Sequence, residues 1–134
     1  MKFNDTLIRV ARKEPVDYVP VWYMRQAGRY DPDYRKIKEK YSLVEITKRP
    51  ELCAEVTMFP VHKLGVDGAI LYSDIMTPLE PMGAHFEIVI GRGPVMDHPI
   101  RSEEDVEALR PLEPEADLPY VLETIDILVR ELKI

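Results

Sequence analysis

Two arginines four positions apart are the residues of this chain best suited to bind an acidic ligand. Arg25 and Arg29 stand in the segment WYMRQAGR, with Gln26, Ala27 and Gly28 between them. Guanidinium groups hold carboxylates with two-pronged hydrogen bonds that lysine cannot reproduce. Gln26 adds a neutral donor and acceptor, and Gly28 lets the backbone turn tightly or approach a ligand. We therefore interpret the segment as an anion-binding loop.

Asp74, like the two arginines, follows a short apolar run. The arginines follow one apolar run, residues 18–24, and Asp74 follows another, residues 68–72. If both runs are parallel strands, the two groups emerge at the same carboxyl-terminal edge of a sheet, where α/β folds bind their ligands.

The charge around the loop leaves a second interpretation open. Residues 23–40 contain six lysines and arginines against three acids, which gives a local positive field suited to a small polyanion. The alternative is structural, with the two arginines paired to Asp31, Asp33 or Asp74.

Helical periodicity and capping signals separate the two apolar runs. Helices are expected from Asn4 or Asp5 to Pro15, over 34–40, after a capping box of Ser42 and Glu45, from Pro50 to Gly65, after Ser102, and from Asp117 or Pro119 onward. The last helix carries one apolar face, made of Leu122, Ile125, Leu128, Val129 and Leu132. A hairpin is expected over 85–90 and 93–97.

Helices that alternate with two short buried strands, over 18–24 and 68–72, predict a parallel sheet in an α/β fold. A closed (β/α)₈ barrel needs about 200 residues or more. The 134 residues of this chain therefore look like an incomplete one.

The composition is that of a globular protein, with 46% hydrophobic and 31% charged residues. A pI near 5.1 makes nucleic acid an unsuitable partner. No apolar stretch approaches the roughly 20 residues that cross a bilayer, and the N-terminus lacks the apolar run of a secretory signal. We expect no membrane partner and a cytoplasmic location. The single cysteine, Cys53, cannot form an intramolecular disulfide.

Two motifs resemble a known family. PVWYMRQAGRY, residues 20–30, closely resembles the N-terminal signature of the uroporphyrinogen decarboxylases, and ILYSDIMTPLEPMG, residues 70–83, resembles their aspartate-bearing segment. An unbroken match with Trp, Met, Gln, Gly and two Arg at fixed offsets is far more specific than a lone glycine-rich pattern. The resemblance continues through GPVMDHPIRSEEDVEALR and PYVLETIDILVRELK, so it covers essentially the whole chain as the N-terminal part of the family.

The resemblance implies the N-terminal portion of a TIM (β/α)₈ barrel, incomplete in this chain, with residues 1–134 as a single partial domain. The implied activity is decarboxylation of the four acetate side chains of uroporphyrinogen III to give coproporphyrinogen III, in haem and porphyrin biosynthesis. It implies no cofactor and no metal, a small-molecule tetrapyrrole as the substrate, and a homodimer when the protein is full length.

The resemblance also gives each site residue a role. Arg25, Gln26, Ala27, Gly28 and Arg29 would bind the acid arms of the substrate, and Asp74 would accept hydrogen bonds from its pyrrole N–H groups. Asp74 would also stabilise the cationic ring formed when a pyrrole carbon is protonated. Arg25 is the second catalytic candidate, and the identity of the proton donor stays open.

Two other function classes stay open. Barrel methyltransferases that use zinc or corrinoid share the fold by analogy, but RQAGR does not mark them, and His62, His85 and His98 lack the spacing of zinc ligands. The second open class is a non-catalytic fragment, or a split half that needs a partner chain. The family's later tyrosine and histidine have no counterpart within these residues, so activity of this chain alone is left open.

Overall fold

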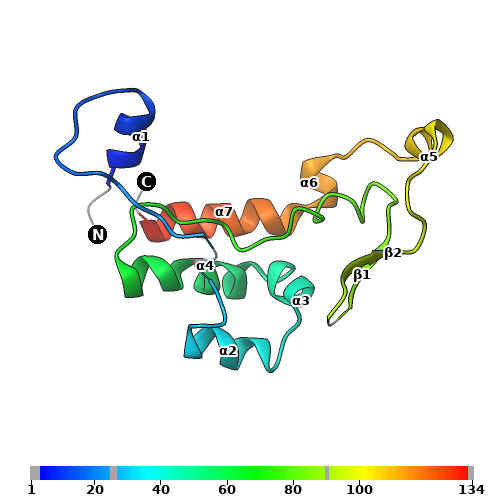
Figure 1. Cartoon of the computed structure of the whole chain (residues 1–134), viewed down its shortest axis with the longest axis horizontal. Helices are drawn as coiled ribbons and strands as arrows, with labels where there is room; N and C mark the ends of the chain where they lie inside the picture. The colour runs from blue at the N-terminus through cyan, green and yellow to red at the C-terminus, as the bar shows by residue number, and fades with distance from the viewer. Residues whose placement is uncertain (1–3, 25–26, 90, 133–134) are drawn as a thin grey trace. The chain divides into compact units, whose positions relative to one another are not determined.

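In the computed structural model of the chain, residues 4–24, 27–89 and 91–132 are described, and the chain forms two compact units. One unit comprises Met1–Tyr72 with Tyr120–Ile134, and the other Ser73–Pro119. The first contains α1 (Thr6–Ala11), α2 (Pro32–Lys38), α3 (Leu43–Thr47), α4 (Pro50–Leu64) and all of α7 (Pro119–Leu132) except its first residue. The second contains β1 (Phe86–Val89), β2 (Gly93–Met96), α5 (Glu103–Glu107) and α6 (Pro114–Asp117) (Figure 1).

Local capping signals set the start of α3 and the end of α4 as the sequence predicts, but α1 ends at Ala11 instead of reaching Pro15, and α2 covers 32–38 rather than 34–40. The Ser42 side chain and Glu45 form both hydrogen bonds of a capping box before α3. Gly65 ends α4 in the left-handed conformation, with φ at 63°, which glycine adopts without a Cβ clash. Before α1 the side-chain oxygen of Asn4 accepts hydrogen bonds from the N–H and hydroxyl of Thr6.

The two expected core strands are not formed in the described residues. Both segments are extended, but Figure 1 draws them without strand arrows. Asp67, directly before the second segment, donates its backbone N–H to Val21 O of the first at 2.9 Å. Pro20 supplies no N–H in the middle of the first segment, which prevents a continuous ladder there. The first segment is also not buried, since Val19 and Met24 are 82% and 80% exposed.

The second segment, 68–72, is covered on one side. Ala69 and Leu71 pack against a buried cluster, whereas Ile70, between them, is half exposed. Alternate residues of an extended chain point to opposite faces, so this segment presents one face to the helices and one away from them. The prediction of a buried strand is therefore wrong for these residues, which form no strand and are covered on one side only.

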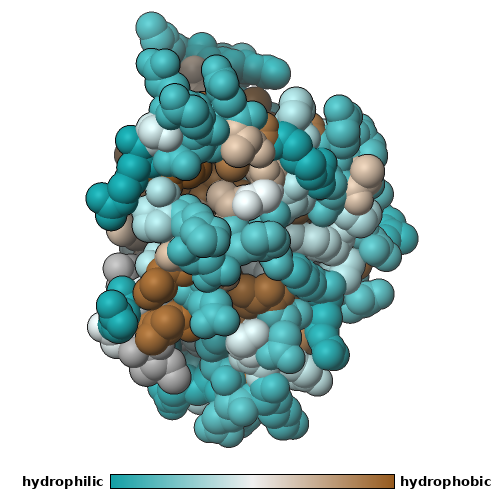
Figure 2. Space-filling view, turned by 90° about the vertical axis from the view of Figure 1, so that its right-hand side faces the viewer, coloured by the Kyte–Doolittle hydropathy of each residue, from teal (hydrophilic) through white to brown (hydrophobic). Residues whose placement is uncertain are grey.

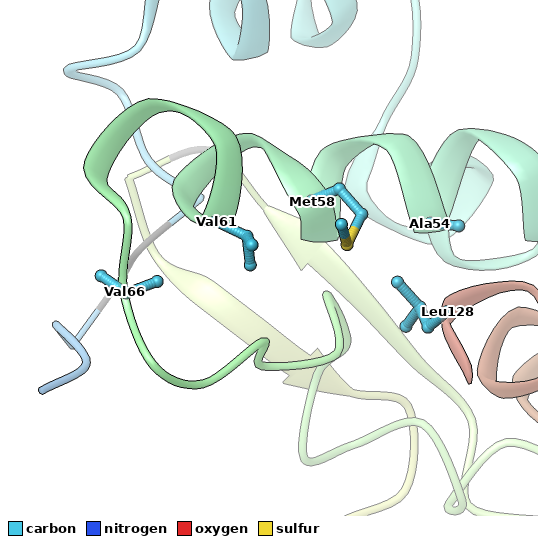
Figure 3. Packing of buried hydrophobic residues seen from close by; sticks show 5 residues of the cluster. All are labelled: Ala54, Met58, Val61, Val66 and Leu128. Atoms are coloured by element: carbon cyan, nitrogen blue, oxygen red, sulfur yellow. The ribbon is translucent and has the colours of Figure 1, made fainter. Parts of the chain in front are cut away.

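Helices α4 and α7 hold the first unit together. Ala54, Met58 and Val61 of α4 form a buried cluster with Val66 and with Leu128 of α7. Figure 3 shows Met58 pointing toward Leu128. The prediction that α7 buries one apolar face is only partly confirmed. Leu128 is buried, but three of the other predicted members are exposed by about two fifths: Leu122, Ile125 and Val129.

A second cluster lies under the start of α2. It consists of Tyr34, Ile46 and Val56, with Ala27 and Tyr72 packed against it. The helices that contribute these residues, α2, α3 and α4, are consecutive in the sequence.

The second unit matches its predicted hairpin. Strands β1 and β2 pair antiparallel, with Phe86 opposite Met96 and Val89 opposite Gly93. Helix α5 begins with a capping box of Ser102 and Asp105, as expected. Helix α6 was not expected. Its region is fixed by Arg110, whose guanidinium donates to both carboxylate oxygens of Asp117 at 3.0 and 2.5 Å.

The chain is therefore mixed α/β, although the one sheet among the described residues is antiparallel rather than parallel. No helix of the described ranges is long and apolar enough to cross a membrane. Figure 2 shows patches of apolar side chains among the mainly hydrophilic ones on the face it displays.

A matched pair of valines tests the core of the first unit. Val56 is 0% exposed and Val19 is 82% exposed. Val56→Ala removes two methyl groups and leaves a cavity, so we expect it to lower the free energy of unfolding by about 2–3 kcal/mol. Val19→Ala should change it by less than about 0.5 kcal/mol. Urea unfolding followed by circular dichroism measures both, and equal effects would contradict this core assignment.

Candidate functional site

The described part of the expected anion-binding loop is a tight turn that leads into α2. Gly28 O accepts a hydrogen bond from Asp31 N at 2.9 Å. Ala27 packs against the second buried cluster. From α2, Arg35 Nη1 donates to Arg29 O at 2.8 Å. The turn is thus held by its own backbone, by the core and by a neighbouring helix.

The structure brings three of the predicted binding residues together in this turn: Ala27, Gly28 and Arg29. Arg25 and Gln26 lie outside the described residues, so their roles stay predictions.

Two aspartates beside the turn are paired with lysines. Lys63 Nζ, from the last turn of α4, lies 2.6 Å from Asp31 Oδ1 and 2.8 Å from Asp33 Oδ2. Lys36 Nζ lies 2.9 Å from Asp33 Oδ1. Asp31 is only 2% exposed, and its Oδ1 also accepts a hydrogen bond from Asp33 N, which caps α2. Both carboxylates are therefore already neutralised.

This pairing removes the structural interpretation for Arg29. Its side chain is exposed, and no carboxylate within residues 4–24, 27–89 and 91–132 forms an ion pair with its guanidinium. Its guanidinium instead lies close enough to another cation, Lys38 of α2, to affect the pKa of that lysine. Partial burial lowers the pKa of Lys38, Glu45 opposes that change, and the positive charge of Arg29 lowers the pKa further. Arg29 is thus free to bind an anion.

Opposite charges set the protonation of the paired groups. Burial alone would raise the pKa of Asp31, but hydrogen bonds from Lys63 and the Asp33 N–H outweigh it and hold that pKa below its ordinary value. Hydrogen bonds from Lys63 and then Lys36 lower the pKa of Asp33 to about 2. The same two aspartates raise the pKa of Lys63. All three groups are charged at neutral pH.

Asp74 lies in the second unit, directly after the second extended segment, and is half-buried. Its Oδ1 accepts a hydrogen bond from Met76 N at 2.8 Å, and its carbonyl accepts one from Thr77 N at 3.0 Å. These bonds fix one carboxylate oxygen at the start of a turn. Oδ2 accepts no hydrogen bond from the part of the chain that the structure describes, so it can accept one from a ligand. Its placement near Arg29 stays a prediction.

Side chains of α4 form hydrogen bonds with the backbone at the end of the second extended segment, as a neighbouring strand would in a sheet. Thr57 Oγ1 accepts a hydrogen bond from Tyr72 N at 2.9 Å, and Cys53 Sγ donates to Tyr72 O at 3.1 Å. Thr57 in turn donates to Cys53 O. The Tyr72 hydroxyl lies 2.9 Å from that of Tyr34. The backbone two residues before Asp74 is therefore anchored to the longest helix of the unit.

Sequence reasoning missed Lys63. It lies 32 residues from Asp31, and no periodic pattern links the last turn of one helix to the cap of another. Lys36 and Asp33, three apart in one helix, have a spacing that does predict a pair. The sequence offered only an indirect signal for Lys63. Asp31 caps a helix beside apolar residues, and a carboxylate that becomes buried there needs a cation to neutralise it.

The described residues hold no candidate metal centre. No group of three or more His, Cys, Asp or Glu side chains there is arranged to hold a metal ion. The three histidines, His62, His85 and His98, are all exposed.

Comparison with known proteins connects both motifs to one family. The family model described as "Uroporphyrinogen decarboxylase (URO-D)" matches residues 2–134. The chain is 63% identical over 129 residues to a uroporphyrinogen decarboxylase of Bacillus velezensis, covering 96% of this chain and 36% of that protein. The corresponding figures are 61%, 96% and 36% for the Bacillus subtilis protein, and 61%, 97% and 38% for that of Geobacillus kaustophilus. The chain thus spans little more than a third of the length of these relatives.

The pKa of Asp33 gives a test of the lysine pairing. Because its pKa in the folded chain, about 2, lies below its ordinary value of 3.8, the ion pairs stabilise the fold fully above about pH 4. That contribution is lost as the pH falls through about 2. We expect a carboxyl ¹³C NMR titration to place the Asp33 transition near 2, and Lys63→Met to move it upward. A transition at 3.8 in the unsubstituted chain would show that the pairs do not form.

Proposed function

Because this chain belongs to the uroporphyrinogen decarboxylase family, we propose that it contributes the first part of an enzyme that converts uroporphyrinogen III to coproporphyrinogen III. The reaction removes the carboxyl groups of the four acetate side chains and needs no cofactor or metal. The single observation that carries the proposal is Arg29. It is an exposed guanidinium on a fixed turn, while the adjacent carboxylates are neutralised by Lys63 and Lys36.

The substrate's carboxylates suit this loop. Arg29 binds one carboxylate with two parallel hydrogen bonds, and Arg25, four residues earlier, binds another. Gln26 and the backbone of Ala27 and Gly28 add neutral hydrogen bonds. The fixed turn reduces the conformational entropy that the loop would lose when it binds substrate.

Asp74 supplies the electrostatic part of the reaction. Protonation of a pyrrole carbon makes the ring cationic, and the electrons of the C–CO₂ bond then flow into the ring as carbon dioxide leaves. A second proton reaches the exocyclic carbon and the ring proton is lost, so each acetate becomes a methyl group with net uptake of one proton. The free oxygen of Asp74 accepts a pyrrole N–H and stabilises the cation.

The architecture we propose is the N-terminal portion of a TIM barrel, with residues 1–134 as one partial domain of a protein that forms homodimers. The run of exposed apolar side chains over residues 18–24, among them Val19 and Met24, supports this view, because contiguous apolar surface is normally covered by further protein. The same observation favours the second candidate, a split half that becomes active only with a partner chain.

A chimera tests the proposed function. Residues 1–134 replace the matching N-terminal segment of the Bacillus velezensis relative, and coproporphyrinogen formation is assayed without oxygen. We expect the chimera to be active and Asp74→Asn to lower kcat about 100- to 1000-fold, as the loss of one preorganised electrostatic group typically does. Arg29→Met should raise KM by about 10-fold or more, since a charge-assisted hydrogen bond contributes about 1.5–3 kcal/mol.

The matched control is Arg12→Met, which removes an exposed arginine from the end of α1. We expect its kcat and KM to equal those of the unsubstituted chimera. Full turnover by the Asp74→Asn chimera, or equal KM values for the Arg29 and Arg12 variants, would refute the assigned roles.

A further inference from the structure

Lys63 lies away from the predicted binding residues in the sequence, yet it contacts the aspartates that border their loop. We propose that Lys63 is a positioning residue. It holds the turn that carries Arg29 and keeps that arginine available for the substrate by neutralising Asp31. This inference rests on the proposed function for its consequence in catalysis, and on the ion pairs for its structural part.

The ammonium of Lys63 is fixed by three contacts. Two are the carboxylate oxygens of Asp31 and Asp33, at 2.6 and 2.8 Å, and the third is the ring of Phe59, whose centroid lies 4.6 Å away. Phe59 is one helical turn earlier on α4, and its ring face attracts a cation. A lysine side chain with this many partners has little rotational freedom, so it can transmit the position of α4 to the loop.

Asp31 connects Lys63 to the turn. Its backbone N–H donates to Gly28 O and closes the turn around Arg29, while its carboxylate caps α2 through Asp33 N. A carboxylate that is 2% exposed needs a counter-charge, because burial without one is strongly unfavourable. Lys63 is that counter-charge.

Removal of Lys63 would leave Asp31 to find another cation. Arg29 is two residues away in the sequence and has no carboxylate partner of its own among the residues that the structure describes. A guanidinium drawn onto Asp31 would no longer be free for the substrate. Lys63 therefore prevents the Arg–Asp pair that the composition of the loop would otherwise favour.

Lys36 provides a matched control within the same network. Among the described residues it pairs with Asp33 only, and its side chain is 72% exposed, compared with 38% for Lys63. Ion pairs of this exposed kind contribute little. Lys36→Met removes the same charge and a similar volume without uncovering Asp31.

The experiment uses the chimera with Lys63→Met, Lys36→Met, and Lys63→Met combined with Asp31→Asn. We expect Lys63→Met to raise KM about 10-fold or more with a smaller change in kcat, and Lys36→Met to leave both within about twofold. The double variant should recover most of the lost affinity, because the neutral amide that Asp31→Asn introduces still caps α2 and does not attract Arg29. A double variant whose KM is no better than that of Lys63→Met would show that Asp31 does not capture Arg29, which would overturn the inference.

A second measurement separates this inference from the proposed function. In this chain, hydrogen exchange of the Asp31 amide reports the turn directly, whether or not the chimera is active. We expect Lys63→Met to accelerate that exchange about 10-fold relative to Lys36→Met, at a temperature where circular dichroism shows all variants folded. Equal exchange rates would overturn the inference. An inactive unsubstituted chimera with the expected exchange difference would instead count against the proposed function alone.

Discussion

The ammonium of Lys63 lies between the carboxylates of Asp31 and Asp33, and the local arrangement of the loop follows from this contact. Asp31 can be buried because Lys63 neutralises it, and a buried Asp31 can both cap α2 and close the turn at Gly28. With both acids occupied, the guanidinium of Arg29 keeps its charge for a ligand. The ion pairs of Lys63 thus leave the guanidinium of Arg29 available to bind an anion.

Helix α4 supports both predicted functional segments. Its last turn holds the anion-binding loop through Lys63, and its middle holds Tyr72 through Cys53 and Thr57. These side-chain hydrogen bonds satisfy backbone groups that a neighbouring strand would satisfy in a sheet. The helix itself is fixed by its packing on α7 through Leu128. The segments that carry Arg29 and precede Asp74 therefore share one rigid support.

The features that the sequence predicted well are local ones. The capping box at Ser42, the left-handed stop at Gly65 and the hairpin of β1 and β2 each depend on residues a few positions apart. The failures are long-range. The first apolar run was predicted as a buried strand, but hydrophobicity cannot reveal which surface covers it, and Pro20 interrupts its ladder. Likewise, the sequence left open whether the arginines of the loop pair with its aspartates, because the lysine that pairs with Asp31 is 32 residues away.

The central claim is that Arg29 and its turn form an anion site that Lys63 protects but does not enter. The most direct test is a ¹⁵N NMR titration of this chain with butane-1,2,3,4-tetracarboxylate, a flexible polycarboxylate probe. The account predicts saturable shifts of the Gly28 and Arg29 amides and of Arg29 Nε, while Lys63 Nζ keeps its shift because it stays paired with Asp31. Shifts at Lys63 Nζ, or none in the loop, would contradict it.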